Sequence, residues 1–241
     1  MRKFGLIGKS LGHSFSKKFF TTFFEENGID AVYENIEVAS AERLSDVLNH
    51  EFSGFNVTIP YKETIIPFLD DLSAEAKAIG AVNVVRKENG RWIGDNSDAF
   101  GFHQSIKPFL TNQHERAIVF GTGGASKAVV YVLKSLGVDV ISVTRNPTGE
   151  NQFSYDEVNE FMIRACKLLV NCTPVGTFPE THEYLDIPYQ ALTHENLVVD
   201  LIYNPPITTF LEKSKQNGAT ILNGESMLKE QALRAWKLWN H

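Results

Sequence analysis

The stretch that most constrains the fold runs from Ala117 to Ser126, where four apolar residues lead into a glycine cluster. Lys127 to Leu136 follows with apolar residues at helical spacing, which predicts a buried strand, a glycine turn and a helix. Glycine lets such a turn adopt positive φ and approach a pyrophosphate, whose charge the helix start favours. A plain tight turn explains the same glycines, because Ser126 stands where the pattern G-x-G-x-x-G has its third glycine.

The next predicted strand indicates which dinucleotide would bind. It covers Val138 to Val143 and ends at Thr144-Arg145-Asn146. An acidic residue at this point usually binds the ribose 2′-hydroxyl of NAD, whereas an arginine accommodates the 2′-phosphate of NADP. Arg145 stands there and no acid does, so the expected cofactor is NADP.

Composition excludes several classes of protein. The 241 residues suffice for one large domain or two small ones, and a net charge of −6 argues against a nucleic-acid binder. Cys166 and Cys172 give neither a metal-ligand spacing nor a disulfide framework. With no recognisable signal peptide and no apolar run of membrane-spanning length, we expect a cytoplasmic protein without membrane contact.

In the N-terminal half, candidate ligand-binding residues stand where helices begin. Ser14 and Ser16 lie at the start of a predicted helix that ends near Asn27, where they either cap it or bind a substrate. A strand at 55–59 is stopped by a proline, which places Thr58 and Lys62 at a carboxyl strand end, where open α/β sheets bind ligands. A lone lysine is more often a solvated surface residue.

Three polar positions need partners. Asn83 falls inside a predicted strand, 81–86, which an Asn-Gly turn joins to a second strand in a hairpin. Ser97 or Asp98 is expected to cap the following helix, or Asp98 presents a carboxylate at its start. Gln231 lies on the apolar face of the last predicted helix, 225–239, so a backbone group or a substrate must bond its amide.

Together these segments resemble the shikimate dehydrogenase family over nearly the whole chain. The resemblance implies an α/β protein with an N-terminal α/β substrate domain, residues 1–98 plus 221–241, and a Rossmann-type NADP-binding domain, residues 99–220. The C-terminal helix would return to the substrate domain. The motifs that carry the likeness are Ser14-Phe15-Ser16, Asn56 to Lys62, Gly80 to Asn83, Asn96-Ser97-Asp98, Gly121 to Ser126, Thr144-Arg145-Asn146, Asp200 to Pro205, and Gly224 to Gln231.

The same resemblance implies a reversible, NADP-linked reduction of 3-dehydroshikimate to shikimate in the biosynthesis of chorismate and the aromatic amino acids. Lys62 would be the acid/base and Asp98 its partner, with no metal. The substrate would be held by Ser14, Ser16, Thr58, Asn83, Tyr203 and Gln231. The cofactor would be held by Gly121, Thr122, Gly123, Gly124, Ala125, Thr144, Arg145, Asn146, Leu201 and Gly224. The expected partner is a small-molecule substrate, and the chain would be a monomer or homodimer.

The residue types suit that reaction. Hydride reduction of a ketone leaves an alkoxide that must be protonated, so an acid has to lie at that oxygen. A lysine can supply the proton, and a nearby carboxylate orients it and favours its charged form. The chain departs from the usual family pattern at Val84, Ser97, Thr122 and Glu225-Ser226.

Three other functions stay open, and one of them, some other Rossmann reductase, predicts no activity on shikimate at all. A quinate/shikimate dehydrogenase that takes NAD is opposed by Arg145. A non-catalytic NADP-binding sensor of the same fold would have no need of both Lys62 and Asp98.

Overall fold

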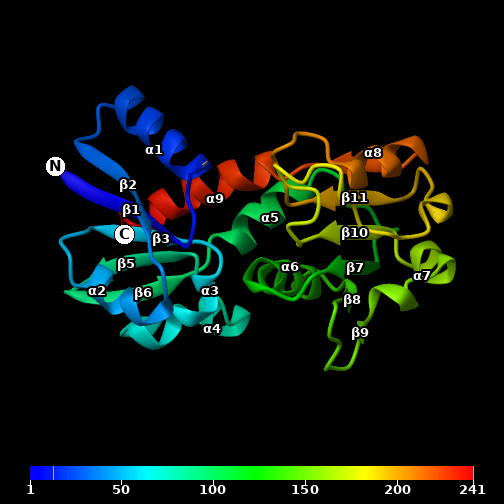
Figure 1. The fold of residues 1–241 in the computed structure, drawn as a ribbon, viewed down its shortest axis with the longest axis horizontal. Helices are drawn as coiled ribbons and strands as arrows, with labels where there is room; N and C mark the ends of the chain where they lie inside the picture. The colour runs from blue at the N-terminus through cyan, green and yellow to red at the C-terminus, as the bar shows by residue number, and fades with distance from the viewer. Residues whose placement is uncertain (13, 241) are drawn as a thin grey trace. The chain divides into compact units, whose positions relative to one another are not determined.

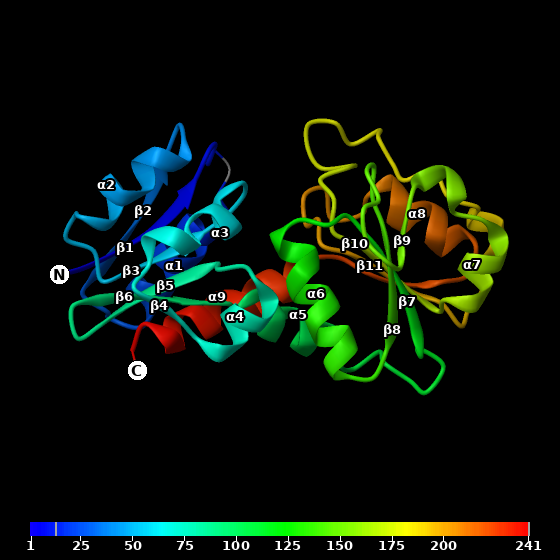
Figure 2. The same ribbon diagram turned by 90° about the horizontal axis from the view of Figure 1, so that it is seen from below.

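The computed structural model describes residues 1–12 and 14–240, drawn in Figures 1 and 2, and it divides into two compact units. Unit 1 comprises Met1–Phe100 together with the segment from Gln231 onward, and unit 2 comprises Gly101–Glu230. Each unit has its own sheet and its own buried apolar core.

Unit 2 contains a parallel sheet in the order β12-β11-β10-β7-β8-β9. Its central strands are buried along almost their whole length because α6 covers one face and α7 and α8 cover the other (Figure 2). The strands are β7 (Arg116–Phe120), β8 (Asp139–Val143), β9 (Gln152–Phe153), β10 (Leu168–Asn171), β11 (Leu197–Asp200) and β12 (Thr220–Leu222). The helices are α6 (Gly124–Ser135), η3 (Tyr155–Glu157), α7 (Glu160–Ala165), η4 (Tyr189–Ala191) and α8 (Thr209–Gln216).

The predicted strand, glycine turn and helix are confirmed as β7, residues 121–123 and α6. The predicted strand at 138–143 is confirmed as β8. Gly121 has φ of +99°, a conformation that costs other residues steric strain.

Unit 1 contains a mixed sheet in the order β2-β1-β3-β5-β6-β4, in which β1 pairs in parallel with both β2 and β3. The strands are β1 (Arg2–Gly8), β2 (Ala31–Glu37), β3 (Gly54–Val57), β4 (Asp71–Leu72), β5 (Val84–Glu88) and β6 (Arg91–Asp95). One core includes residues of α1 (Phe15–Glu26) and α9 (Glu225–Leu238). The other includes residues of η1 (Ala41–Arg43), α2 (Leu44–Leu48), α3 (Tyr61–Thr64), η2 (Ile66–Phe68) and α4 (Ala74–Ile79).

The last helix returns to unit 1, as the resemblance implied. Trp239 stacks on Phe4 with ring centroids 4.6 Å apart, and its Nε1 donates to the Val85 carbonyl at 3.1 Å. Gly54 leaves the space for this indole, because a Cβ there would collide with the ring. The C-terminal helix is therefore part of the core that contains β1.

The hairpin is confirmed as β5 and β6, with positive φ at both Asn89 (52°) and Gly90 (81°), as an Asn-Gly type I′ turn requires. The expectation that Asn83 lies within the strand is wrong: β5 begins at Val84. The main chain of Asn83 instead bonds two other strands, its N–H donating to the Asp95 carbonyl at 3.1 Å and its carbonyl accepting from Val57 at 2.9 Å.

The chain passes between the units within helices. α5 (Asp98–Ile106) begins in unit 1 and continues in unit 2, and α9 begins in unit 2 and ends in unit 1. Among the described residues, no helix is both long and apolar enough to cross a membrane.

Candidate active site

Lys62 and Asp98 form a buried ion pair in unit 1. Lys62 lies on α3, which follows β3, and Asp98 is the first residue of α5. The Lys62 Nζ lies 2.6 Å from Asp98 Oδ2, and only 13% of the lysine side chain and 2% of the aspartate side chain are exposed. Removing one partner of such a pair leaves the other charge buried and unpaired, which lowers the free energy of unfolding by about 3–5 kcal/mol. The structure thus brings together the two residues expected to carry the acid–base chemistry.

The Asn83 amide holds Asp98 from a second direction. Its Nδ2 donates to Asp98 Oδ1 at 2.8 Å and to Gln231 Oε1 at 3.0 Å. Its Oδ1 accepts from the Ser97 main-chain N–H at 2.6 Å. Because that N–H can only donate, it determines which end of the amide faces Asp98. The partner of Gln231 is therefore a side chain, where the sequence led us to expect a backbone group or a substrate.

Asn96 caps α5, so the expectation that Ser97 or Asp98 does so is wrong. Asn96 Oδ1 accepts from the Ala99 N–H at 3.2 Å, and its Nδ2 donates to the Ala81 carbonyl at 2.9 Å. With capping done by Asn96, the Asp98 carboxylate points to Lys62 and Asn83. Its place in the first helical turn also favours a negative charge through the helix dipole.

The remaining substrate candidates of unit 1 follow the carboxyl ends of two adjacent parallel strands. β1 ends at Gly8 before the segment that carries Ser14 and Ser16, and β3 ends immediately before Thr58. Ser14 accepts from the Lys17 N–H at 3.2 Å and so caps α1, which leaves its hydroxyl proton able to donate. Ser16 and Thr58 are half-buried.

Two residues of β2 that the sequence did not single out hold the loop before Ser14. Asn35 Nδ2 donates to the Leu11 carbonyl at 2.9 Å, and Glu37 Oε1 accepts from the Leu11 N–H at 2.7 Å. One available signal was Asn35 itself, because asparagine is depleted in strands unless its amide is bonded.

Two further buried hydrogen bonds hold the main chain of Asn83. The Tyr33 hydroxyl donates to Asn56 Oδ1 at 2.7 Å, and Asn56 Nδ2 donates to the Asn83 carbonyl at 3.2 Å. Burial raises the pKa of Tyr33 far above its ordinary value, so the phenol remains a neutral donor. Sequence patterns could not reveal this arrangement, because it joins β2, β3 and the segment before β5.

In unit 2 the glycine turn has the shape that a dinucleotide requires. Gly123 is the N-cap of α6 with ordinary φ of −80°, and apart from its two chain neighbours no residue has an atom within 4 Å of where its Cβ would be. A glycine that neither the backbone conformation nor the packing explains, beside the N–H groups of a helix start, fits close approach of a pyrophosphate. Gly124 and Ala125 form the first turn of this helix.

Ser126 fits in place of the third glycine because its hydroxyl donates back to the Gly123 carbonyl at 2.7 Å. Thr122 and Thr144 approach each other, with their hydroxyl oxygens 3.5 Å apart, so the ends of β7 and β8 lie together. Arg145 and Asn146 follow β8 and are exposed, as residues that receive a 2′-phosphate must be.

Leu201 and Gly224 lie against each other. A Cβ on Gly224 would collide with the Leu201 backbone, and the Gly224 N–H donates to the Ile202 carbonyl at 3.0 Å. Ser226 lies on α9 without positive φ, so its departure from the family pattern causes no backbone strain. Tyr203 is half-buried in unit 2, so the structure does not place it beside the substrate candidates of unit 1.

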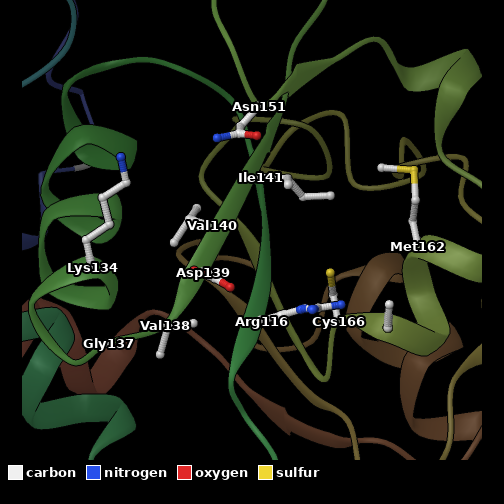
Figure 3. A pocket seen from close by; sticks show the side chains of 11 residues that line it. Arg116, Lys134, Gly137, Val138, Asp139, Val140, Ile141, Asn151, Met162 and Cys166 are labelled. Atoms are coloured by element: carbon white, nitrogen blue, oxygen red, sulfur yellow. The ribbon is translucent and has the colours of Figure 1, made fainter.

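A hollow of about 720 Å³ lies elsewhere in unit 2, along β8 (Figure 3). Its lining includes Arg116 and Asp139, the first residues of β7 and β8, and Cys166, whose pKa burial raises to about 11. Arg116 and Asp139 stand at the amino end of the sheet, opposite the glycine turn, so this hollow is not the dinucleotide site. No cluster of described His, Cys, Asp and Glu side chains could hold a metal ion.

Comparison with known proteins identifies the family. A family model described as the shikimate dehydrogenase substrate binding domain matches residues 6–85. A shikimate dehydrogenase (NADP(+)) of Chlorobaculum tepidum is 36% identical over 267 residues, which cover 98% of this chain and 89% of that protein. The chain belongs to the shikimate dehydrogenase family.

Solved structures of this family have the same fold. The crystal structure of shikimate dehydrogenase from Aquifex aeolicus matches with a TM-score of 0.88 at 34% identity, covering 100% of this chain and 92% of that one. Shikimate 5-dehydrogenase from Thermus thermophilus, crystallised with NADP(H) and shikimate, matches with a TM-score of 0.86 at 33% identity, covering 99% of this chain and 93% of that one. The α/β fold with substrate and Rossmann-type domains is therefore the fold of a shikimate dehydrogenase.

Proposed function

We propose that this chain is an NADP-dependent shikimate dehydrogenase, which reversibly reduces 3-dehydroshikimate to shikimate. The observation that carries the proposal is the buried Lys62–Asp98 pair, with 2.6 Å between Nζ and Oδ2, held in place by Asn83. A protein that only bound the dinucleotide would gain nothing from keeping a lysine so far from solvent.

In the direction of reduction, bound NADPH supplies a hydride to the carbonyl carbon. Lys62 then donates a proton from Nζ to the oxygen that becomes an alkoxide, so an O–H bond forms as an N–H bond breaks. In the reverse direction the neutral amine takes the hydroxyl proton. Asp98 orients the amine through the hydrogen bond that its Oδ2 accepts.

The other site residues have the chemistry to hold shikimate. Ser14 has a hydroxyl proton to donate to the substrate carboxylate because its oxygen already accepts from the backbone. Gln231 presents its NH₂ group to a ring hydroxyl because its carbonyl oxygen accepts from Asn83. Ser16, Thr58, Asn83 and Tyr203 complete the proposed substrate set.

The proposed cofactor set consists of the glycine turn (Gly121, Thr122, Gly123, Gly124, Ala125), the end of β8 (Thr144, Arg145, Asn146), and Leu201 with Gly224. The open space at Gly123 supports a pyrophosphate there, and Arg145 supports a 2′-phosphate. The NADP(+) dependence in the names of the relatives agrees with this choice over NAD.

The decisive experiment is absorbance of reduced nicotinamide with shikimate as substrate, comparing NADP with NAD and shikimate with quinate. We expect turnover of shikimate with a lower KM for NADP than for NAD. Arg145→Ala should raise the KM for NADP by about tenfold, the factor for one lost charged hydrogen bond, and leave that for NAD unchanged. A lower KM for NAD, or comparable turnover of quinate, would support the quinate/shikimate alternative. Absence of turnover with retained NADP binding would support the sensor.

Domain roles and cellular context stay predictions. The compact units place the C-terminal return at Gln231, whereas the proposed substrate domain takes it from residue 221. A cytoplasmic location, the absence of nucleic-acid binding, and a monomer or homodimer also remain expectations.

A further inference from the structure

Asp200 is a buried carboxylate that the proposed chemistry does not use. It is the last residue of β11 and is 0% exposed. Its Oδ1 accepts from the Ile202 N–H at 3.1 Å, and its Oδ2 accepts from the Thr208 hydroxyl at 2.6 Å. One carboxylate therefore joins the two ends of the loop 202–208, one end to each oxygen.

A neighbouring asparagine fixes the orientation of this carboxylate. Asn171, the last residue of β10, donates from Nδ2 to Asp200 Oδ1 at 3.1 Å. Its Oδ1 accepts from the Thr173 N–H at 2.9 Å and from the Thr173 hydroxyl at 2.7 Å, so the amide has a single orientation. The carboxyl ends of two adjacent strands are thereby bonded to each other.

The loop held in this way carries the proposed substrate-binding residue Tyr203, and the residue just before the loop, Leu201, belongs to the proposed cofactor set. Leu201, directly after Asp200, packs against Gly224, and its N–H donates to the Asn171 carbonyl at 3.0 Å. Tyr203 follows Ile202 within the loop. Carboxyl strand ends are where sheets of this type bind ligands, so the position of this loop matters to a ligand.

We propose that Asp200 is a positioning residue of the shikimate dehydrogenase site, acting through Ile202 and Thr208 to hold the loop that presents Tyr203. The proposal rests on the proposed function. Burial raises the pKa of Asp200 to about 6 although three hydrogen bonds oppose the shift. A fully buried acid is costly, which supports a role beyond packing.

The test removes the hydroxyl that Asp200 uses at the far end of the loop. Thr208→Val keeps the branched shape but loses the bond, whereas Thr208→Ser keeps a hydroxyl. For Thr208→Val we expect the KM for shikimate to rise about fivefold or more, the factor for one lost hydrogen bond, with kcat within about twofold. Thr208→Ser should restore the wild-type KM to within about twofold.

A matched control separates positioning from lost helix capping, because Thr208 also caps α8. Asn159 caps α7 in the same unit by accepting from the Met162 N–H at 3.2 Å. Asn159→Ala should lower the melting temperature without raising the KM for shikimate. In a Tyr203→Phe background, Thr208→Val should raise the KM for shikimate by a smaller factor than in the wild type. Both changes weaken the same proposed contact between Tyr203 and the substrate.

Three results would overturn the proposal: an unchanged KM in Thr208→Val, an equal rise in Asn159→Ala, or additive effects of Thr208→Val and Tyr203→Phe. The wild-type rate with shikimate and NADP is measured first. If it is zero, the proposed function fails by itself. Fluorescence titration with NADPH then tests whether the loop is displaced, without any need for turnover. Displacement of Leu201 should weaken NADPH binding in Thr208→Val but not in Asn159→Ala.

Discussion

Lys62 shows at the scale of one residue how burial sets the proposed acid–base lysine apart from a surface lysine. Lys77 also forms an ion pair, 2.8 Å from Asp71, but more than half of its side chain is exposed, against 13% for Lys62. Exposed pairs contribute at most about 1 kcal/mol, whereas breaking a buried pair is expensive. Asp98 is the partner that makes burial of Lys62 possible.

Lys62→Ala should lower kcat by at least about a hundredfold, the usual scale for an acid–base group, and leave NADPH affinity unchanged. Steady-state rates with shikimate and fluorescence titration with NADPH measure the two effects. Lys77→Ala is the control and should change neither. Near-normal turnover in Lys62→Ala would show that Lys62 is not the acid/base of the reaction.

Asp200 predicts a pH dependence of stability with a defined sign. Its pKa in the folded state is about 6, above the ordinary 3.8. The folded state therefore favours the protonated acid, and the stability that this group contributes is fully present below about pH 4 and lost as the pH rises through about 6. A shift of this size corresponds to about 3 kcal/mol.

Asp200→Asn cannot titrate at this position. The difference in unfolding free energy between wild type and Asp200→Asn should therefore move by up to about 3 kcal/mol in favour of the variant between pH 4 and pH 7. Urea unfolding across this range measures it. Parallel pH curves for the two proteins would show that Asp200 does not titrate as the structure indicates.

At the scale of elements, two glycines next to helix starts have opposite reasons for being glycine. At Gly123 a Cβ would meet open space, whereas at Gly224 it would collide with the Leu201 backbone. Gly123→Ala should keep the wild-type melting temperature but weaken NADPH binding by about tenfold or more, because the methyl group would occupy ligand space.

Gly224→Ala should instead lower the melting temperature, because the backbone of one segment would have to move. Thermal unfolding and NADPH titration of both variants measure the contrast. Tight NADPH binding in Gly123→Ala would place the pyrophosphate away from this turn.

Elements with strong periodicity or turn signals were predictable from the sequence. The order of β7, the glycine turn and α6 followed from helical spacing after an apolar run, and the β5–β6 hairpin followed from Asn89-Gly90. The two-residue strands β4 and β9 carry too few residues for any pattern. The short helices η1 and α2 are likewise too brief to give a clear helical period.

Chain position singled out several site residues as candidates, and the resemblance assigned their roles. Lys62, Asp98, Asn83 and Gln231 were named in advance, and the structure brings them together. The supports of the site, such as Asn35 and Glu37 on the Leu11 backbone, depend on pairing between distant segments, which no local pattern encodes.

At the scale of the whole molecule, the tryptophans report on one unit. The chain has three, and Trp92, Trp236 and Trp239 all belong to unit 1. The apolar core of unit 2 contains none of them. Tryptophan fluorescence therefore follows unfolding of unit 1, while bound NADPH reports on unit 2.

NADP at a hundred times its Kd should add about 2.7 kcal/mol to the unfolding free energy of the unit that binds it. We expect NADP to raise the unfolding temperature followed by circular dichroism. The unfolding temperature followed by tryptophan fluorescence should rise less, because the two units have separate cores. Scans with and without NADP, followed by both signals, measure it. Equal shifts in both signals would show that the units unfold as one.

The amide of Asn83 bonds both segments in which the chain passes between the two units. Its Nδ2 bonds Asp98, two residues before the chain leaves unit 1 at Phe100, and Gln231, the residue at which the chain comes back. The segment that leaves unit 1 and the segment that returns to it are thus hydrogen-bonded to the same side-chain amide. A displacement of α9 at Gln231 would reach Asp98, and through it the Lys62 amine, by way of the Asn83 amide, so Asn83 connects the returning segment to the buried ion pair.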